Sequence, residues 1–310
     1  MRSTSKKVGV SMMMLATLLW GYMGVSSRVL NQISLRSVDI SFIRALSAAI
    51  MLTIFLFFTN RSAFRLPVKG LIFACFYGIL CFAIGMSFYS LSVDNIPISV
   101  ATILMFSNPI WATLFGKIFF GDTISSKKLL IMLLCLIGCM CIIDIFSARG
   151  AQLNIIGVLA GILNGMTFSL QIVLPRFVEH KVSKDSLLLY GFWSATICLA
   201  FFVDIGDIAG KVAGSDRPVF YVANLLIIGI LCTFVAISLY VKSTKYIGTS
   251  LPSMMSAMEP VFASVIAFFV FSEVMKSIQI LGAIIIISSV IALEVDIKKI
   301  LSVRVPRHSV

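Results

Sequence analysis

The chain has 310 residues, of which 59% are apolar and 12% are charged, and its formal net charge is +12. Soluble domains carry about 25% charged residues, so a chain this apolar cannot cover a surface that faces water. At about 20 residues per span, ten spans use about 200 residues and leave only short connections. The composition therefore predicts a multi-spanning membrane protein and excludes a sizeable soluble domain.

Charge and cysteine usage exclude further classes. The Lys and Arg residues lie between apolar stretches and not on one face, which argues against nucleic acid as a partner. The seven cysteines all fall inside apolar stretches and their number is odd, so no disulfide framework is expected. Cys135, Cys139 and Cys141 are close in sequence, but Cys141 faces away from the other two on a helix, which favours packing over a metal site.

Apolar stretches of helical length follow one another along the chain, separated by charged residues and turn formers. Strands are excluded because these stretches are too long and do not alternate between polar and apolar residues. We therefore expect an all-α membrane protein with ten transmembrane helices. The expected spans are 8–28, 39–58, 69–91, 97–119, 127–145, 154–174, 186–203, 220–242, 248–271 and 277–296.

The positions of Lys and Arg predict the orientation, because cytoplasmic connections are enriched in positive charge. With the N-terminus inside, the inner segments hold 18 of these residues and the outer segments hold six. We therefore expect a multi-pass protein of the cytoplasmic (inner) membrane with both termini in the cytoplasm. The first apolar run lacks a small-residue cleavage site, so it is expected to be a span and not a cleaved signal peptide.

The second half of the chain repeats the first, with a shift of 151 residues over most of the match. This shift aligns Asn108-Pro109 with Glu259-Pro260, and acidic Asp122 with acidic Glu273. Each half has an odd number of expected spans, so the two copies must have opposite orientations, as in transporters that alternate access to a midplane site. The expected segments are a cytoplasmic N-terminus 1–7, a first five-helix repeat 8–145, a second five-helix repeat 154–296 and a basic cytoplasmic tail 297–310.

Short motifs follow one another along the first half, and two motifs of the second half echo the pattern. They are Leu19-Trp20-Gly21, Phe42-Ile43-Arg44-Ala45, Tyr89-Ser90-Leu91-Ser92, Pro109 followed by Gly121-Asp122, Glu259-Pro260 and Ser272-Glu273. In this order they resemble the EamA-type drug/metabolite transporter superfamily over residues 8–296. The resemblance implies a secondary transporter that moves small metabolites, often outward. It also implies a cavity between spans 1, 3 and 4 of one half and spans 6, 8 and 9 of the other, and it leaves the cargo open.

Glu259 is the sharpest polar feature of the spans. It lies about eleven residues into the ninth span, roughly 16 Å deep and near the midplane. A bare carboxylate at this depth costs several kcal/mol, so the side chain is expected to be neutral, paired or facing water. It can bind substrate and carry a proton during transport, or it can be a protonated structural group that bonds a neighbouring helix.

Other polar and aromatic residues lie at similar depth. Midplane amides can line a cavity or simply join helices, and the two tyrosines can form gates or interfacial anchors. Arg44 is expected to be mainly structural. The row Gly157, Gly161 and Gly165 predicts close helix approach, and Asn164 shares its face. The candidate substrate-binding residues are Trp20, Tyr89, Asn108, Trp111, Asn164, Gln171, Tyr240 and Glu259.

An enzyme is not expected, because the chain lacks convergent acids, bases, nucleophiles or metal ligands in its spans. One acid beside amides and indoles suits a small amino acid or related compound, exported by alternating access, with protons as a candidate coupling ion. Membrane lipid is the other expected partner, and no cofactor or metal is expected. The alternatives are an importer or exchanger of a nucleoside-like metabolite and a lipid-handling flippase or scaffold, for which a polar groove should open sideways to lipid.

Overall fold

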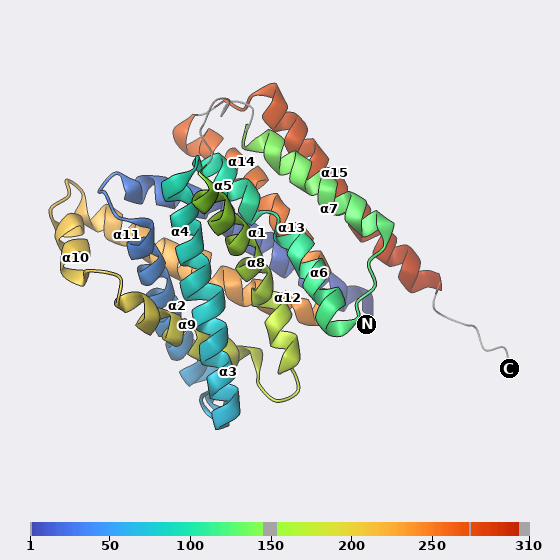
Figure 1. Cartoon of the computed structure of the whole chain (residues 1–310), viewed down its shortest axis with the longest axis horizontal. Helices are drawn as coiled ribbons and strands as arrows, with labels where there is room; N and C mark the ends of the chain where they lie inside the picture. The colour runs from blue at the N-terminus through green and yellow to red at the C-terminus, as the bar shows by residue number, and fades with distance from the viewer. Residues whose placement is uncertain (1, 145–153, 273, 304–310) are drawn as a thin grey trace.

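The computed structural model describes residues 2–144, 154–272 and 274–303, and within these ranges the chain forms helices and no strands (Figure 1). The expected all-α class is therefore confirmed. The first half contains α1 (Arg2–Asn31), α2 (Ser37–Thr59), α3 (Val68–Gly78), α4 (Gly85–Asn95), α5 (Ile98–Met105), α6 (Asn108–Phe120) and α7 (Ser126–Ile142). The second half contains α8 (Ile155–Val173), α9 (Lys184–Ala200), α10 (Ile205–Ala213), α11 (Pro218–Gly229), α12 (Ala236–Ile247), α13 (Ser250–Met255), α14 (Glu259–Phe271) and α15 (Ser277–Val303).

Length and composition support fewer spans than the expected ten. In the described part of the chain, seven helical segments are long and apolar enough to cross a membrane, and an eighth is possible if α9 and α10, bent by 89°, form one broken span. Helix α7 has 17 residues, and the apolar part of α15 is the short stretch Ser277–Ala292. The seven segments are Ser5–Ser26, Ser37–Thr59, Val68–Asn95, Val100–Phe120, Ile155–Phe177, Pro218–Ile247 and Ser250–Phe271.

Helix α10 was not expected from the sequence. Asp204 caps its start by accepting hydrogen bonds from the backbone N–H groups of Gly206 and Asp207, at 2.8 and 3.1 Å. Ile208 and Val212, four residues apart, are buried on one face. This is the pattern of a short amphipathic helix. The helix was not expected because the segment is too short to cross a membrane.

The same irregular backbone occurs in both halves at the shift of 151. A π-helical turn, Ile79–Ile84, joins α3 to α4, and a second one, Ile230–Val235, joins α11 to α12. Helices α6 and α14 both have 13 residues, and each ends at a left-handed residue, Gly121 at φ 68° and Ser272 at φ 55°. Since a π turn is a rare defect, its recurrence at one offset fits a two-repeat architecture. The acidic partner of Asp122 in this alignment, Glu273, lies outside the described residues.

The spans expected at 97–119 and 248–271 correspond to the apolar segments Val100–Phe120 and Ser250–Phe271, but the α-helix is interrupted within each of them. Helix α5 ends at Met105 and α6 begins at Asn108, while a 3₁₀ turn, η6 (Ser256–Met258), separates α13 from α14. Each break is followed by a proline at the start of the next helix, Pro109 or Pro260. Proline fits the first turn of a helix but cannot donate inside one, which explains why both breaks occur where they do.

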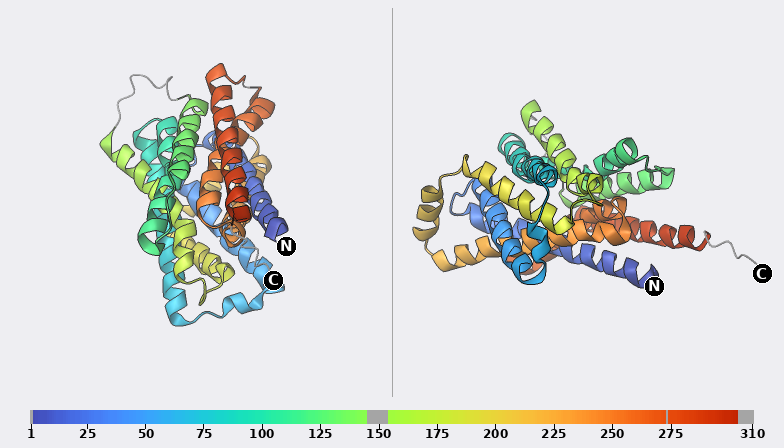
Figure 2. Two further views of the ribbon diagram at one scale, coloured as in Figure 1. Left: turned by 90° about the vertical axis from the view of Figure 1, so that its right-hand side faces the viewer. Right: turned by 90° about the horizontal axis from the view of Figure 1, so that it is seen from below.

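The two halves pack against each other and are not separate lobes. Helix α1 packs on α12 and α14, α4 packs on α8, and α3 packs on α9. Helices α7 and α15 lie side by side along one flank of the bundle (Figure 1). The start of α1 and the end of α15 lie on the same side of the molecule (Figure 2). One end of the bundle, where α6 ends and α9 begins, is called the Arg176 end. The opposite end, where α2 begins, is called the Arg36 end.

Candidate functional site

Glu259 begins α14 directly after the broken segment of its span. Its side chain is partly exposed inside the bundle, and it makes no hydrogen bond or ion pair with the residues that the structure describes. The start of a helix places positive backbone N–H dipoles near an acid, which favours a negative group there. The structure therefore presents a carboxyl group near mid-span that is available to a ligand or a proton.

Arg44 of α2 and Tyr89 of α4 lie within electrostatic range of Glu259. The Arg44 Nε donates a hydrogen bond to Thr233 Oγ1 at 3.0 Å, and Thr233 is fully buried on the second π turn. The Thr233 hydroxyl donates in turn to the Ile228 carbonyl at 2.8 Å. Arg44 was expected to be mainly structural, but its electrostatic interaction with Glu259 makes it a further candidate for the site, which sequence reasoning did not include. The one available signal was a lone guanidinium inside a span.

Three aromatic side chains from three helices form a cluster. The ring centroids of Trp20 and Tyr240 are 5.1 Å apart, and those of Trp20 and Phe168 are 5.6 Å apart. The rings of Phe168 and Tyr240 stack at 5.8 Å. Tyr240 is fully buried and Trp20 is 3% exposed, so these two candidates pack mainly against protein. Such ring pairs each contribute about 0.5–1.5 kcal/mol beyond burial, so the cluster holds α1, α8 and α12 together.

Asn108, the repeat partner of Glu259, is fully buried at the contact between α6 and α13. Its Oδ1 accepts a hydrogen bond from Ser253 Oγ at 2.8 Å, and its Nδ2 donates to Ser256 Oγ at 3.4 Å and to the Met105 carbonyl at 3.3 Å. The amide therefore joins the broken spans of the two halves. This geometry favours the helix-joining alternative for Asn108 over direct contact with a ligand.

Asn164 and Gln171 of α8 are buried against the first half of the chain. The Asn164 Nδ2 donates to the Gly85 carbonyl at 2.8 Å, where the first π turn ends. The Gln171 backbone carbonyl accepts the Tyr77 hydroxyl at 3.0 Å. Asn164 is 6% exposed and Gln171 is 5% exposed, so both residues lie between helices.

The glycine row on α8 packs as the sequence predicted. A Cβ atom at Gly161 would lie 2.6 Å from Leu104 Cδ1 and 2.9 Å from Ser92 Oγ, and one at Gly165 would lie 2.7 Å from the Leu104 carbonyl oxygen. These distances are too short for any side chain, so the row permits close approach of α8 to α5 and α4. The prediction of close helix approach is confirmed.

Trp111 lies apart from the aromatic cluster. Its Nε1 donates to Ser107 Oγ at 3.0 Å, and its ring lies 6.2 Å from that of Phe115. Further aromatic contacts follow: the ring centroids of Phe115 and Phe119 are 5.8 Å apart, and those of Phe119 and Phe177, in the second half, are 5.5 Å apart. The structure therefore does not bring Trp111 together with Trp20.

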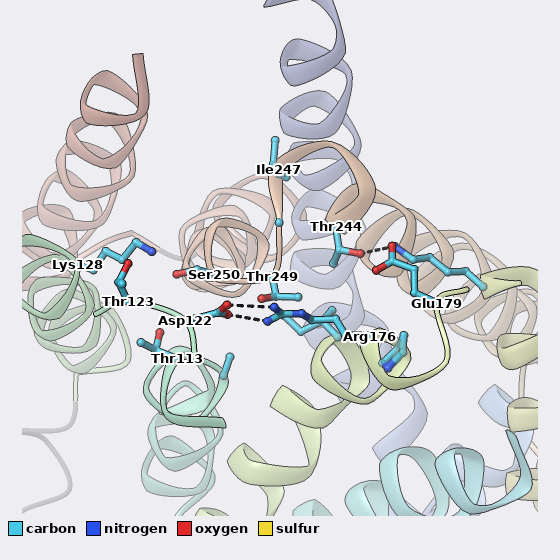
Figure 3. A pocket seen from close by; sticks show the side chains of 15 residues that line it. Thr113, Asp122, Thr123, Lys128, Arg176, Glu179, Thr244, Ile247, Thr249 and Ser250 are labelled. Atoms are coloured by element: carbon cyan, nitrogen blue, oxygen red, sulfur yellow. Dashed lines mark hydrogen bonds and ion pairs between the residues drawn. The ribbon is translucent and has the colours of Figure 1, made fainter. Parts of the chain in front are cut away.

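A polar pocket of about 420 Å³ lies at the Arg176 end and is lined by residues of both halves (Figure 3). Asp122 and Arg176 both line this pocket, and the Asp122 carboxylate accepts two hydrogen bonds from Arg176, at 2.6 and 3.0 Å. The Arg176 guanidinium also lies 3.9 Å from the ring centroid of Phe120. The hydrogen bonds from Arg176 lower the pKa of Asp122 below its ordinary value. Elsewhere in the pocket lining, the Lys184 ammonium donates a hydrogen bond to Thr244 Oγ1 at 2.6 Å. The candidate residues chosen from the sequence do not line this pocket.

The comparisons with known proteins agree with this architecture. Residues 7–144 and 155–294 match the model of the EamA-like transporter family, once for each half of the chain. The chain belongs to the EamA-like transporter family. With its apolar helices, it is a multi-pass membrane transporter.

Two curated proteins and a solved structure are also similar to this chain. An uncharacterized transporter of Archaeoglobus fulgidus is 22% identical over 205 residues, 66% of this chain and 69% of the relative. An uncharacterized transporter of Clostridium kluyveri is 23% identical over 224 residues, 69% of each chain. A crystal structure with 15% identity superposes over 97% of this chain and 99% of its own with a TM-score of 0.75, which is a likeness of fold alone.

Proposed function

We propose that this EamA-family member is a secondary-active transporter that exports a small amino acid or related compound across the cytoplasmic membrane by alternating access. The observation that carries the proposal is the partly exposed Glu259 carboxyl near mid-span, without a protein partner among the described residues. A charge in that position is costly unless water, a proton or a cationic group balances it. A substrate amino group and a proton can take turns in balancing it, which links their movements.

The proposed topology has ten spans, with both termini in the cytoplasm and the repeats at 8–145 and 154–296. Helices α7 and α15 would be the fifth and tenth spans, because they pair with each other along one flank of the bundle. The Arg176 end would then face the cytoplasm. The basic tail from 297 onward would begin in the last turns of α15. Its residues 304–310 and the connection 145–153 lie outside the described ranges.

The two ends of the bundle suggest how access alternates. Toward the Arg176 end, the Trp20–Phe168–Tyr240 cluster and the Asp122–Arg176 pair hold the halves together. At the other end, Arg44 lies only seven residues after Ser37, the first residue of α2. We infer that this conformation closes the cytoplasmic side and turns Glu259 toward the outside. In the return state, the contacts at the Arg176 end would separate.

A lipid-handling function receives less support. A crevice of about 310 Å³ between α1, α13 and α15 is lined by Val10, Met14, Leu251, Met255, Met258, Ile287, Val290 and Ile291. These side chains are all apolar, so this crevice offers nothing to a lipid headgroup. A flippase needs a polar path for the headgroup, and the polar groups described above lie elsewhere in the bundle.

The test is counterflow of radiolabelled amino acids in proteoliposomes, with Glu259→Gln beside the wild type. We expect wild-type exchange of at least one amino acid, and a loss of at least tenfold in apparent affinity in Glu259→Gln. Asp94→Asn is the control, because it removes a carboxylate from an exposed position at the end of α4. If Glu259→Gln transports with wild-type rate, affinity and pH profile, the acid is structural and the charge-based mechanism fails.

A further inference from the structure

Building on the proposed function, we infer that Arg44 and Glu259 form one binding site for a zwitterion. In this site Arg44 would bind the substrate carboxylate, while Glu259 would bind the substrate amino group. The two residues come from different halves of the chain, Arg44 from α2 and Glu259 from the start of α14. The site would therefore exist only when the halves are brought together.

The two charges are close but do not pair. They are within electrostatic range of each other, yet no nitrogen of Arg44 lies within the 4.0 Å of Glu259 that defines an ion pair. An isolated charge inside the membrane is costly, and a direct ion pair would have been the simplest way to balance both groups. Their separation leaves each charge ready for a ligand group of opposite sign.

Arg44 is oriented as a receptor for a carboxylate. Its Nε is held by Thr233 Oγ1 at 3.0 Å, and no acceptor for its two terminal nitrogens is found among the described residues. Two parallel N–H groups of a guanidinium match the two oxygens of a carboxylate, which makes this pairing stronger and more directional than one with an ammonium group. The π turn that carries Thr233 therefore fixes Arg44 with its binding edge free.

The remaining neighbours preserve the charge balance. Tyr89 lies within range of both Arg44 and Glu259, and the thiols of Cys232 and Cys139 are the other titratable groups that interact with this pair. None of these three carries a charge in its ordinary state at neutral pH. The site thus combines one guanidinium, Arg44, with one carboxyl group, Glu259, which a substrate amino group would hold in its ionised form. A simple amine would be repelled by Arg44 and a simple carboxylate by Glu259, whereas a zwitterion satisfies both.

The test begins with the twenty protein amino acids, screened by thermal shift on the purified protein in detergent. The best ligand is then compared with its decarboxylated amine and its deaminated acid, for example L-leucine with isopentylamine and 4-methylpentanoate. We expect the wild type to bind the zwitterion at least tenfold more tightly than either analogue. If no amino acid binds, or if the amine binds as tightly as the zwitterion, the inference is overturned.

Variants separate the two ends of the site. Arg44→Gln should weaken binding of the zwitterion at least tenfold and leave the amine unchanged or tighter, and Arg44→Lys should restore part of the loss. Glu259→Gln should show the reverse preference and keep the acid. Arg65→Gln, which removes an exposed guanidinium, is the control. Equal weakening of zwitterion and amine by both Arg44 variants would make Arg44 structural. That result leaves the Glu259 mechanism standing, whereas wild-type behaviour of Glu259→Gln removes the proposed function itself.

Discussion

Asp122 and Arg176 join the two halves of the transporter at one end of the bundle, through hydrogen bonds of 2.6 and 3.0 Å from one guanidinium to one carboxylate. Asp122 follows the left-handed Gly121 that ends α6, and Arg176 lies in the short 3₁₀ turn after α8. A planar two-bond pair of this kind is the strongest form that a side-chain ion pair takes. In the proposed alternating-access cycle, this pair would separate when this end opens.

Asp122→Asn should lower the stability of the observed state. Asp122 is 43% exposed, so solvent screening limits the expected loss to about 0.5–1 kcal/mol at neutral pH. Because the pKa of Asp122 is lowered in the folded state, the stabilisation is fully present above the ordinary value of 3.8 and is lost as the pH falls through the folded value. The gap in melting temperature between wild type and variant should therefore be constant near neutral pH and shrink below about pH 4.

Differential scanning fluorimetry in detergent across this pH range measures the gap. Asp207→Asn is a suitable control, because Asp207 pairs with Lys211 at 2.7 Å within a single helix. Identical melting of Asp122→Asn and the wild type at neutral pH would show that the pair adds nothing to the stability of this state.

Gly161→Leu should lower the free energy of unfolding by at least about 2 kcal/mol, because the new side chain would force α8 away from Leu104 and Ser92. Gly24→Leu is the matched control, since a Cβ atom at Gly24 meets nothing within 4 Å, and it should change stability by less than about 0.5 kcal/mol. Thermal unfolding and size-exclusion profiles in detergent compare the two. A stable Gly161→Leu protein with altered substrate choice would place this face of α8 on the substrate path.

Glu259→Gln should remove the pH response of substrate accumulation while exchange of substrate down its gradient survives. The amide keeps the shape of the acid but cannot take up or release a proton. Arg44, Tyr89, Cys232 and Cys139 also interact in this region, so the remaining response of the variant reports on them. Uptake into proteoliposomes with an imposed pH gradient measures the effect. A variant that keeps the wild-type pH profile would assign coupling to another group.

Cysteine labelling should place Arg61→Cys on the cytoplasmic side and Ser215→Cys outside. The reason is the excess of positive charge on the expected inner segments. An impermeant maleimide, applied to intact cells and then to opened membranes, distinguishes the two sides. A cysteine in the tail beyond residue 303 should label only in opened membranes. Labelling of that tail on intact cells would overturn the charge count and the proposed inward position of the Arg176 end.

The sequence predicted the course of the chain because the bilayer imposes simple rules on it. The expected span 39–58 corresponds to α2 at Ser37–Thr59, and the expected span 277–296 starts where α15 starts. The shift of 151 also pointed to the paired helices that begin at Asn108 and Glu259. Apolar length and a repeated motif are local properties, so they can be counted along the chain.

The breaks and π turns could not be predicted in the same way. Pro109 and Pro260 signal a disturbance, but a proline in the first turn of a helix and one inside a kinked helix look alike in sequence. The π turn at Ile79–Ile84 contains only apolar residues and one cysteine, so no side chain announces it. Its partner comes from the other half of the chain, since the Asn164 side chain donates a hydrogen bond to the carbonyl of Gly85, directly after the turn.

By itself, then, the sequence determined that this protein is a helical membrane transporter with two related halves, and it singled out Glu259 as a costly charge at mid-span. Only the tertiary structure decided which polar groups meet. It buried Asn108 and Asn164 between helices and brought Arg44 within range of Glu259. The physical reason is that depth and hydrophobicity follow from residues near one another in the chain. The partner of a buried polar group is set by how distant helices pack, and the sequence does not state that packing.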